Sequence, residues 1–487
     1  MCVFQETRLT MGDRCIQRHP SVQAYSTADG GAVLIHPDLG LDMFINPLAR
    51  FIWERLYPGI TVRNLTEIVG EATEGAAADE IREDIREFVE ELESAKMVID
   101  VKCTADSAGL PASEPVILGE WNSAPGHLDL SLTHRCNLKC PYCFYDDEMA
   151  VEKDLTTDQW LTFIDHLRRL PVRELILSGG EVFTRRDLPV LLDAMEAAGK
   201  RFAVLTNGTL VNDAWIDVLK RHRSRLSYVQ FSVDGSCPQV HDSIRGPGTF
   251  IRTMEGLKRV LAAGLPDMVR MTITRLNAGD IEPTMDLLLG ELGVRQVGTN
   301  DVVTIGAGCR INLGLTAPQH IEAMRSLVRM SGKYPGRIQA SAGPLARYRT
   351  YRDIDRAMAG ETVRSSYRMG RLTSCGCMGL KLAILHDGMI SPCNMLSDLH
   401  LGNILTDSLE EVWRYSPILK AMRDRARISL KEIEECRDCE YADYCTGNCP
   451  ATRFAETGNL NLPNTSDCYR QFLETCGGIK PWNDQEP

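Results

Sequence analysis

The feature that most constrains the fold is a regular alternation of strand-like and helical segments between residues 127 and 330. Six strand-like runs are separated by amphipathic helical patterns, and such a run of β–α units predicts a parallel sheet. The strand-like runs begin near His127, Arg173, Arg201, Ser227, Asp267 and Gly293. The helical patterns lie near 156–170, 187–199, 212–222, 249–263 and 280–292. We therefore expect an α/β fold with a partial (β/α)6 TIM-like barrel, in which ligands bind beyond the carboxyl ends of the strands.

Three cysteines follow the first strand-like run at Cx3CxxC spacing: Cys136, Cys140 and Cys143. Three thiolates on one short loop can hold a soft inorganic centre and leave one of its coordination positions open. The chain has 17 cysteines in 487 residues, and nine of them lie between Cys375 and Cys476. Because the sequence shows no signal peptide, this clustering favours metal or redox chemistry over a disulfide framework.

The Cx3CxxC loop resembles the radical S-adenosylmethionine (SAM) motif, Cx3CxΦC, with Tyr142 in the aromatic position. The resemblance implies that the three cysteines of the loop hold a 4Fe–4S cluster whose open iron binds SAM. An electron from the cluster would then cleave SAM to a 5′-deoxyadenosyl radical. The alternative is a zinc knuckle or a chance clustering of cysteines.

Further short motifs of the same superfamily end the later strand-like runs. Gly-Gly-Glu ends the second run, with Val182 in place of the usual proline, and Thr-Asn-Gly ends the third. The resemblance implies that the glycine pair meets the amino group of SAM, that Ser232 binds the ribose, and that Arg245 pairs with the carboxylate. A surface or capping role is the alternative for Arg245. The expected SAM-contact residues are Tyr142, Gly179, Gly180, Glu181, Ser232 and Arg245.

Residues 20–102 show the pattern of a separate unit, preceded by a lead-in without periodicity over residues 1–20. Two short strand-like runs, 32–36 and 41–45, are joined by a Pro-Asp-Leu-Gly turn, and three amphipathic helical patterns follow. Helix starts are indicated at Asn46-Pro47 and at Thr61, where the side chains can cap a helix.

This pattern resembles the winged-helix, PqqD-like domain of the pyrroloquinoline quinone peptide chaperone. The resemblance implies that the leader of a ribosomally made precursor peptide adds as a strand near residues 41–45 and rests against the third helix. The alternative is a winged-helix module with a structural or DNA-related role.

Residues 103–126 contain several Pro, Gly and Ser and are interpreted as a linker to the barrel over residues 127–330.

The C-terminal region, residues 331–487, carries the pattern Gx4C, then CxxCx5Cx3C, then one further cysteine. It resembles the SPASM extension of radical SAM peptide maturases, which holds two auxiliary 4Fe–4S clusters. Carried over by position, the ligands of one cluster are Cys436, Cys439, Cys445 and Cys468. The ligands of the other are Cys393, Cys449 and one or both of Cys375 and Cys377. The alternative is a pair of structural zinc sites.

Composition limits the partners. The net charge of −12 and the pI near 5.4 argue against nucleic acid as a partner, because nucleic-acid binding needs basic surface. The sequence has no run of 18 apolar residues, so we expect no membrane span and a cytoplasmic protein.

Together the resemblances imply a peptide maturase with SAM, three 4Fe–4S clusters and an external electron donor such as flavodoxin or ferredoxin. It would bind the leader of a precursor peptide and install a thioether or C–C crosslink in its core. The sulfatase-maturing relatives place a carboxylate base directly after the Gx4C cysteine, whereas this chain has Asn394, which disfavours formylglycine formation. The alternatives are a maturase of a folded protein, a pyrroloquinoline-quinone-type peptide cyclase, and a leader-binding scaffold with degenerate clusters.

Overall fold

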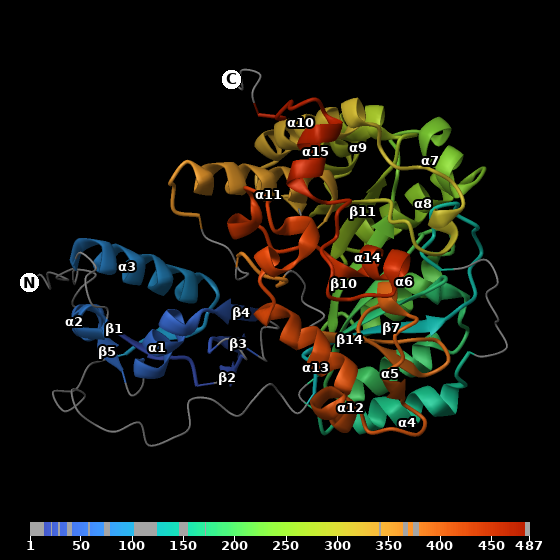
Figure 1. Cartoon of the computed structure of the whole chain (residues 1–487). Helices are drawn as coiled ribbons and strands as arrows, with labels where there is room; N and C mark the ends of the chain where they lie inside the picture. Colours follow the sequence, from blue (N-terminus) through green and yellow to red (C-terminus); the bar gives the residue numbers. More distant parts are fainter. Residues whose placement is uncertain are drawn as a thin grey trace, which may run out of the picture. The chain divides into compact units, whose positions relative to one another are not determined.

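A computed structural model of the chain divides into two compact units, Met1–Asn122 and Ser123–Pro487 (Figure 1). The structure describes residues 14–20, 22–27, 30–36, 41–56, 59–72, 78–101, 124–145, 154–170, 172–339, 342–363, 369–373 and 379–482. The predicted linker over 103–126 lies almost entirely outside these ranges. Within them, none of the helices has the length and hydropathy needed to cross a membrane.

The N-terminal unit contains two small antiparallel sheets. The first has the order β2 (Gln23–Ser26), β3 (Ala32–His36), β4 (Leu41–Ile45); the β3–β4 hairpin, which pairs Leu34 with Met43, confirms the two strands predicted over 32–36 and 41–45. The second has the order β5 (Ile60–Thr61), β1 (Cys15–Arg18), β6 (Val98–Asp100). The expectation of a loose lead-in over residues 1–20 is wrong for residues 15–18, which form β1. Ile16 pairs with Ile60 and Asp100, so partners that are distant in the sequence, rather than local periodicity, make this segment a strand.

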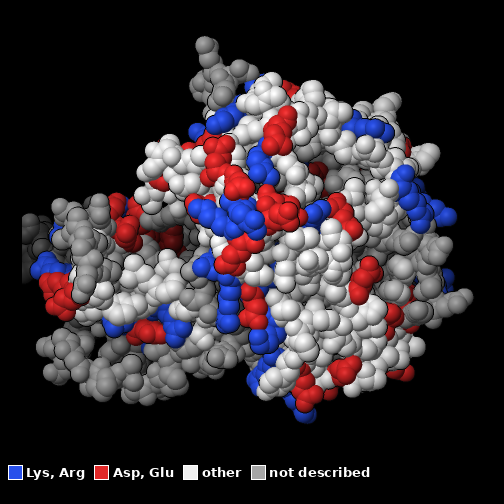
Figure 2. Space-filling view, viewed as in Figure 1, with Lys and Arg blue, Asp and Glu red and all other residues white. Residues whose placement is uncertain are grey.

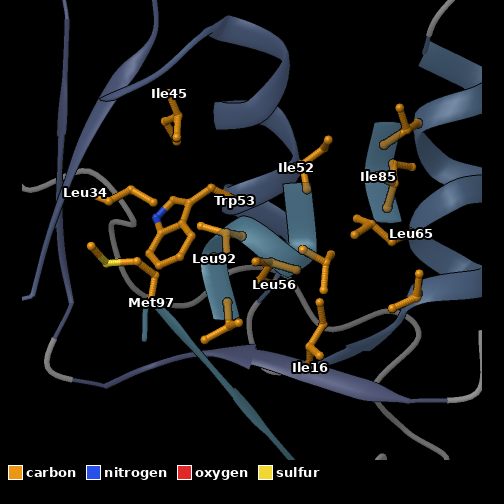
Figure 3. Close-up of a cluster of buried hydrophobic side chains, with 14 of the residues drawn as sticks. Ile16, Leu34, Ile45, Ile52, Trp53, Leu56, Leu65, Ile85, Leu92 and Met97 are labelled. Carbon is orange, nitrogen blue, oxygen red and sulfur yellow. The ribbon is translucent and has the colours of Figure 1, made fainter. Parts of the chain in front are cut away.

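Three helices complete this unit: α1 (Pro47–Arg55), α2 (Val62–Ala72) and α3 (Ala78–Ser94). The Asn46 side chain accepts a hydrogen bond from the Ala49 N–H at 2.8 Å, and the Thr61 hydroxyl accepts one from the Asn64 N–H at 3.1 Å, so both predicted caps are confirmed. The helices bury their apolar faces against the sheets, and Trp53 lies beside Leu34, Leu92 and Met97 (Figure 3).

The C-terminal unit is built on a sheet of ten strands, in the order β13-β12-β11-β10-β9-β8-β7-β14-β15-β16. Strands β7 to β13 run parallel to their neighbours, which confirms the parallel α/β sheet expected from the sequence. Their bounds are β7 (His127–Thr133), β8 (Glu174–Gly179), β9 (Arg201–Thr206), β10 (Leu226–Ser232), β11 (Asp267–Ile273), β12 (Val297–Asp301) and β13 (Ile338–Gln339).

Helices connect these strands and flank the sheet (Figure 1). They are α4 (Thr157–Leu167), α5 (Leu188–Ala197), α6 (Asp213–Arg221), α7 (Pro238–Arg245), α8 (Thr249–Ala262), α9 (Ile281–Met285), α10 (Ala317–Lys333) and α11 (Gly343–Met358). Two details differ from the expectation: α7 is an additional helix, and β12 begins at Val297 rather than near Gly293. The reason for the second is a turn over residues 292–296: the helix ends at Glu291, and Gly293 follows with φ +71° before the strand begins.

The cysteine-rich region joins the same sheet. Strand β14 (Lys381–Ile384) pairs in parallel with β7, and β15 (Met389–Ser391) and β16 (Gly402–Asn403) extend the sheet antiparallel. The remaining helices are α12 (Leu409–Tyr415), α13 (Pro417–Asp424), α14 (Pro450–Thr457) and α15 (Tyr469–Thr475). Acidic and basic side chains are interspersed over the molecular face shown in Figure 2.

Candidate iron–sulfur and cofactor site

The Cx3CxxC loop begins three residues after β7 and lines a cavity of about 1090 Å³ together with residues from the ends of neighbouring strands. Cys136, Cys140 and Cys143 all line this cavity, as do Gly180 and Tyr145. The loop therefore stands at the carboxyl end of the parallel sheet, which is the edge where such folds bind ligands.

Backbone contacts hold the loop against the Gly-Gly-Glu segment at the end of β8. The Gly180 N–H donates to the Thr133 carbonyl at 2.8 Å, and the Glu181 N–H donates to the Arg135 carbonyl at 2.7 Å. A Cβ on Gly180 would lie 2.2 Å from the Arg135 oxygen, and one on Gly179, which has φ +135°, would lie 2.3 Å from the Thr133 oxygen. The two glycines are thus required by the close approach of the cysteine loop itself.

Glu181 is 1% exposed and ties the end of β8 to the Thr-Asn-Gly segment after β9. Its carboxylate accepts hydrogen bonds from the Thr206 hydroxyl at 2.7 Å, the Asn207 N–H at 2.7 Å and the Phe183 N–H at 3.2 Å. Burial raises the pKa of Glu181, and these hydrogen bonds oppose that rise. The contacts of Glu181 are therefore with the protein backbone and Thr206, which makes it a structural tie between two sheet ends.

A buried polar group lies next to Cys140. The Tyr142 hydroxyl and the Arg245 Nε both donate to Asp234, at 2.6 Å and 2.5 Å, and the guanidinium of Arg245 lies 5.5 Å from the centre of the Tyr142 ring. The charge of Arg245 also acts on Cys140, where it opposes the rise in pKa that burial causes. Asp234 thus brings Tyr142 and Arg245 together, and the charges of Asp234 and Arg245 act on Cys140.

The chemistry of the three thiols fits a cationic centre. Burial raises the pKa of Cys136 to about 11 and also raises that of Cys140, so these two thiols keep their protons at neutral pH. A bound iron centre would stabilise the thiolates and displace these protons. Among the described residues, no three or more His, Cys, Asp or Glu side chains lie close enough together to hold a single metal ion. A 4Fe–4S cluster is larger than one ion, so its cysteine ligands lie further apart than the ligands of one ion.

The other predicted SAM-contact residues are only partly gathered around this cavity. Gly180 lines it, whereas Ser232 ends β10 and pairs in register with Arg270 of β11. Tyr142 and Arg245 meet at Asp234, as described above.

Four cysteines of the C-terminal region form a second group. Burial, followed by the charges of Cys445, Cys468 and Cys439, raises the pKa of Cys436 to about 12. The pKa of Cys445 is raised to about 11, first by burial and then by Cys468 and Cys439. The structure thus places together the four residues predicted to share one auxiliary cluster.

The second predicted auxiliary set is only partly described. Cys393 follows β15, and Cys449 is the residue before α14. Cys375 and Cys377 lie outside the described residues, so their expected role remains a prediction.

Sequence reasoning missed two features of the site. Asp234 was visible in the motif Phe231-Ser-Val-Asp-Gly235, directly after β10, but its role depends on contacts with Tyr142 and Arg245 that no local pattern shows. The second feature is a hydrogen-bonded chain: the Ser131 hydroxyl lies 2.6 Å from the Tyr145 hydroxyl and donates to Asn394 Oδ1 at 3.3 Å. It connects β7 and the cysteine loop to the residue after Cys393.

Comparison with known proteins finds three families along the chain. Residues 31–98 match coenzyme PQQ synthesis protein D (PqqD), residues 130–288 match the radical SAM superfamily, and residues 375–440 match the SPASM iron–sulfur cluster-binding domain.

Relatives agree with these matches. The chain is 28% identical over 341 residues to the AdoMet-dependent heme synthase of Methanosarcina barkeri, covering 69% of this chain and 94% of the synthase. It is 28% identical over 345 residues to the PqqA peptide cyclase of Ruegeria pomeroyi, covering 69% and 85%. Its fold is similar to that of Streptococcus suis SuiB bound to the precursor peptide SuiA, with a TM-score of 0.61, 14% identity, and coverage of 93% and 99%.

The order of the matches is that of the structural elements described above: a small N-terminal unit, a parallel sheet with the Cx3CxxC loop, and a cysteine-rich tail. The chain thus contains regions that match the PqqD, radical SAM and SPASM domains, in the combination that matches a radical SAM/SPASM peptide maturase with an N-terminal PqqD-like domain, and these domains imply SAM and iron–sulfur clusters as cofactors.

Proposed function

We propose that this protein is a radical SAM enzyme that binds the leader of a ribosomally synthesised precursor peptide and oxidatively installs a crosslink, thioether or C–C, in the core of that peptide. The observation that carries the proposal is the fusion of a PqqD-like unit, residues 31–98, to a radical SAM and SPASM chain. A peptide-binding unit on the same polypeptide keeps the substrate at a high effective concentration near the site.

Three 4Fe–4S clusters are proposed. Cys136, Cys140 and Cys143 would hold the SAM-binding cluster, and Cys436, Cys439, Cys445 and Cys468 one auxiliary cluster. Cys393 and Cys449, with Cys375, Cys377 or both, would hold the other. The bound cofactors supply one-electron chemistry and a radical able to abstract hydrogen from an unactivated C–H bond.

The balance of a crosslinking reaction explains the cysteine-rich tail. A new C–C or C–S bond removes two hydrogens from the peptide: one is abstracted as an atom, and the other leaves as a proton. One electron then remains on the peptide and needs an acceptor. The C-terminal cysteines lie in the same compact unit as the Cx3CxxC loop, and through β14 they join the sheet of that loop, so an acceptor held there is close to the reaction.

No carboxylate base is expected at residue 394. The Asn394 amide accepts a hydrogen bond from Ser131 and cannot take up a proton at neutral pH, unlike the carboxylate that sulfatase-maturing relatives have there. Ser131 and Tyr145 instead present hydroxyl groups, and burial raises the pKa of Tyr145 to about 12, so its hydroxyl stays protonated. Ser131 is 1% exposed and its hydroxyl contacts Tyr145 and Asn394, so this neutral group supplies no base for deprotonation of a serine or cysteine substrate.

The leader is proposed to add beside β4, the last strand in the order β2-β3-β4. Leu41 and Phe44 of β4 are 39% and 41% exposed, and Leu48 at the start of α1 is 43% exposed. Leu41 and Phe44 lie three residues apart and so point to opposite faces of β4, and strand addition, in which the peptide places side chains on alternate faces, is a common mode of peptide recognition. An external electron donor, flavodoxin or ferredoxin, completes the proposal.

The test is anaerobic reaction of the reconstituted protein with SAM, a reductant and the precursor peptide encoded beside it. The expected products are 5′-deoxyadenosine and a peptide lighter by two hydrogens, with fragmentation that shows an internal link. Replacing Cys136, Cys140 and Cys143 together by alanine should abolish both, while Cys309→Ser, at an exposed cysteine outside the predicted ligands, should change neither. Absence of 5′-deoxyadenosine with the unaltered protein would refute the proposal.

A second candidate is porphyrin chemistry, favoured by the 28% identity to a heme synthase. The match takes up 94% of that synthase but 69% of this chain, so this chain is the longer of the two. Incubating the protein with an iron porphyrin in place of the peptide separates the two candidates. If the protein crosslinks peptides, the porphyrin should be unchanged; if it acts on porphyrins, the porphyrin should be modified.

A further inference from the structure

We propose that Asp234 is a positioning residue that fixes the guanidinium of Arg245 for recognition of a carboxylate, that of the methionine part of SAM. The inference deepens the proposed function and rests on it, since it concerns how the same site takes its cofactor. It assigns a role to Asp234, a buried acidic residue that makes no hydrogen bond with any of the cysteines that the structure describes.

The carboxylate of Asp234 is completely buried and has three donors around it. Oδ2 accepts hydrogen bonds from the Tyr142 hydroxyl at 2.6 Å and from Arg245 Nε at 2.5 Å, and Oδ1 accepts one from the Thr272 N–H at 2.8 Å. Donors on both oxygens fix the rotation of the carboxylate group. Asp234 therefore presents one defined edge to Arg245.

The backbone of Asp234 is held as firmly as its side chain. Its N–H donates to His241 Nδ1 at 3.1 Å, and its carbonyl accepts a hydrogen bond from the Asn277 side chain at 2.9 Å. Burial lowers the pKa of His241 to about 4, so the ring is neutral and can accept this hydrogen bond. Strand β10, helix α7 and the segment after β11 thus converge on one residue.

Arg245 keeps donors for a second anion. It is 9% exposed and uses Nε for Asp234, while its two terminal amino groups make no hydrogen bond with any residue that the structure describes. Its charge acts on Cys140 of the cysteine loop and on Glu181 at the end of β8. The ring of Tyr142, 5.5 Å away, adds a favourable contact with the cation.

A planar carboxylate is the ligand that this arrangement fits. A guanidinium presents its donors as a fork, and a carboxylate accepts two of them side by side. The terminal amino groups of Arg245 can hold such a ligand carboxylate within the region where the charge of Arg245 acts on Cys140, and SAM carries a carboxylate at its amino-acid end. Without Asp234 the guanidinium could rotate away from this position, or it would be a buried charge without its partner.

The test compares ligands with and without the carboxylate. SAM and 5′-methylthioadenosine share the adenosine and sulfur parts, but only SAM has the methionine amino and carboxylate groups. We expect Asp234→Glu, which keeps the charge and displaces it by one methylene group, to weaken SAM binding to the cluster-loaded protein about tenfold or more, the effect of a lost hydrogen bond to a charged group. Binding of 5′-methylthioadenosine should not change.

Two further variants keep the test decisive. Asp280→Asn is the matched control, because Asp280 accepts hydrogen bonds from the Ser236 N–H and hydroxyl and does not contact Arg245; it should bind SAM like the unaltered protein. Tyr142→Phe retains the ion pair and should weaken SAM binding less than Asp234→Glu, so it supplies the comparison if the latter folds poorly.

Equal weakening of both ligands by Asp234→Glu would show a merely structural role and overturn the inference, as would unchanged SAM affinity. The measurement is equilibrium dialysis without peptide, which excludes a carboxylate of the peptide as the ligand measured. Failure of the unaltered protein to cleave SAM would instead refute the proposed function, so the two failures are distinguishable.

Discussion

The contact between Gly180 and the cysteine loop allows a quantitative prediction for the substitution Gly180→Ala. The added Cβ would lie 2.2 Å from the Arg135 carbonyl oxygen, whereas contacts of a Cβ under 3.0 Å are essentially absent from proteins. The two segments must therefore separate by at least the difference between these distances, about 0.8 Å. Arg135 directly precedes Cys136, so this displacement reaches the first cysteine of the loop.

The displacement also breaks the hydrogen bonds that hold the loop. The Glu181 N–H to Arg135 bond, 2.7 Å, and the Gly180 N–H to Thr133 bond, 2.8 Å, both span the interface that opens. At about 1 kcal/mol for each bond, and somewhat more for buried groups left without partners, Gly180→Ala should destabilise the protein by about 2–4 kcal/mol. Part of this cost will be relieved if the cysteine loop detaches.

The assay is the iron and sulfide content after anaerobic reconstitution, together with thermal unfolding. We expect Gly180→Ala to lose the same share of iron as the protein in which Cys136, Cys140 and Cys143 are all replaced by alanine. Gly279→Ala is the control, since a Cβ there meets nothing within 4 Å and the backbone has no positive φ. If Gly180→Ala retained its full iron content and the unfolding temperature of Gly279→Ala, the argument from close approach would be wrong.

Three further predictions concern other parts of the chain. Phe44→Asp, at an exposed position of β4, should weaken binding of the precursor peptide in a fluorescence titration. The control Ile99→Asp, at an exposed position of β6, should leave the binding unchanged. Equal effects of the two substitutions would contradict a leader site at β4. Cys436→Ala should reduce the iron content and the yield of crosslinked peptide while leaving 5′-deoxyadenosine formation from SAM largely intact; undiminished crosslinking would contradict a role of the tail in electron acceptance. Burial lowers the pKa of Lys200 from 10.5 to about 8. Between these pH values Lys200 is protonated in the unfolded chain and neutral in the folded protein. Raising the pH removes the proton from the unfolded chain, so the contribution of Lys200 to the free energy of unfolding rises with pH across that window. Chemical denaturation of Lys200→Met and the unaltered protein at pH 8 and pH 10 tests this, and a difference in stability that is independent of pH would refute it.

The sequence predicts most of the sheet because its signals there are local. Six β–α units, the caps at Asn46 and Thr61, and the glycine pair after β8 can each be read from a few neighbouring residues. Strand β1 could not be read in this way, because Ile16 becomes part of a strand only through partners at Ile60 and Asp100.

The candidate site shows the same limit. The positions of the cysteines in Cx3CxxC and CxxCx5Cx3C carry their own signal, because ligand spacing is a property of the sequence. The contact of Asp234 with Tyr142 joins residues 92 positions apart, and the contact of Ser131 with Asn394 joins residues 263 apart. Such pairs depend on tertiary packing, so only the folded chain shows that they meet.

The parallel pairing of β14 with β7 has a consequence for how the protein is made. His127 pairs with Lys381, so the strand that leads into the cysteine loop gains its second neighbour only after another 254 residues have left the ribosome (381 minus 127). Until then β7 is an edge strand, and exposed edges are sites of aggregation. We therefore expect that a chain truncated before β14 is poorly soluble, and that iron is loaded at the loop after synthesis is complete.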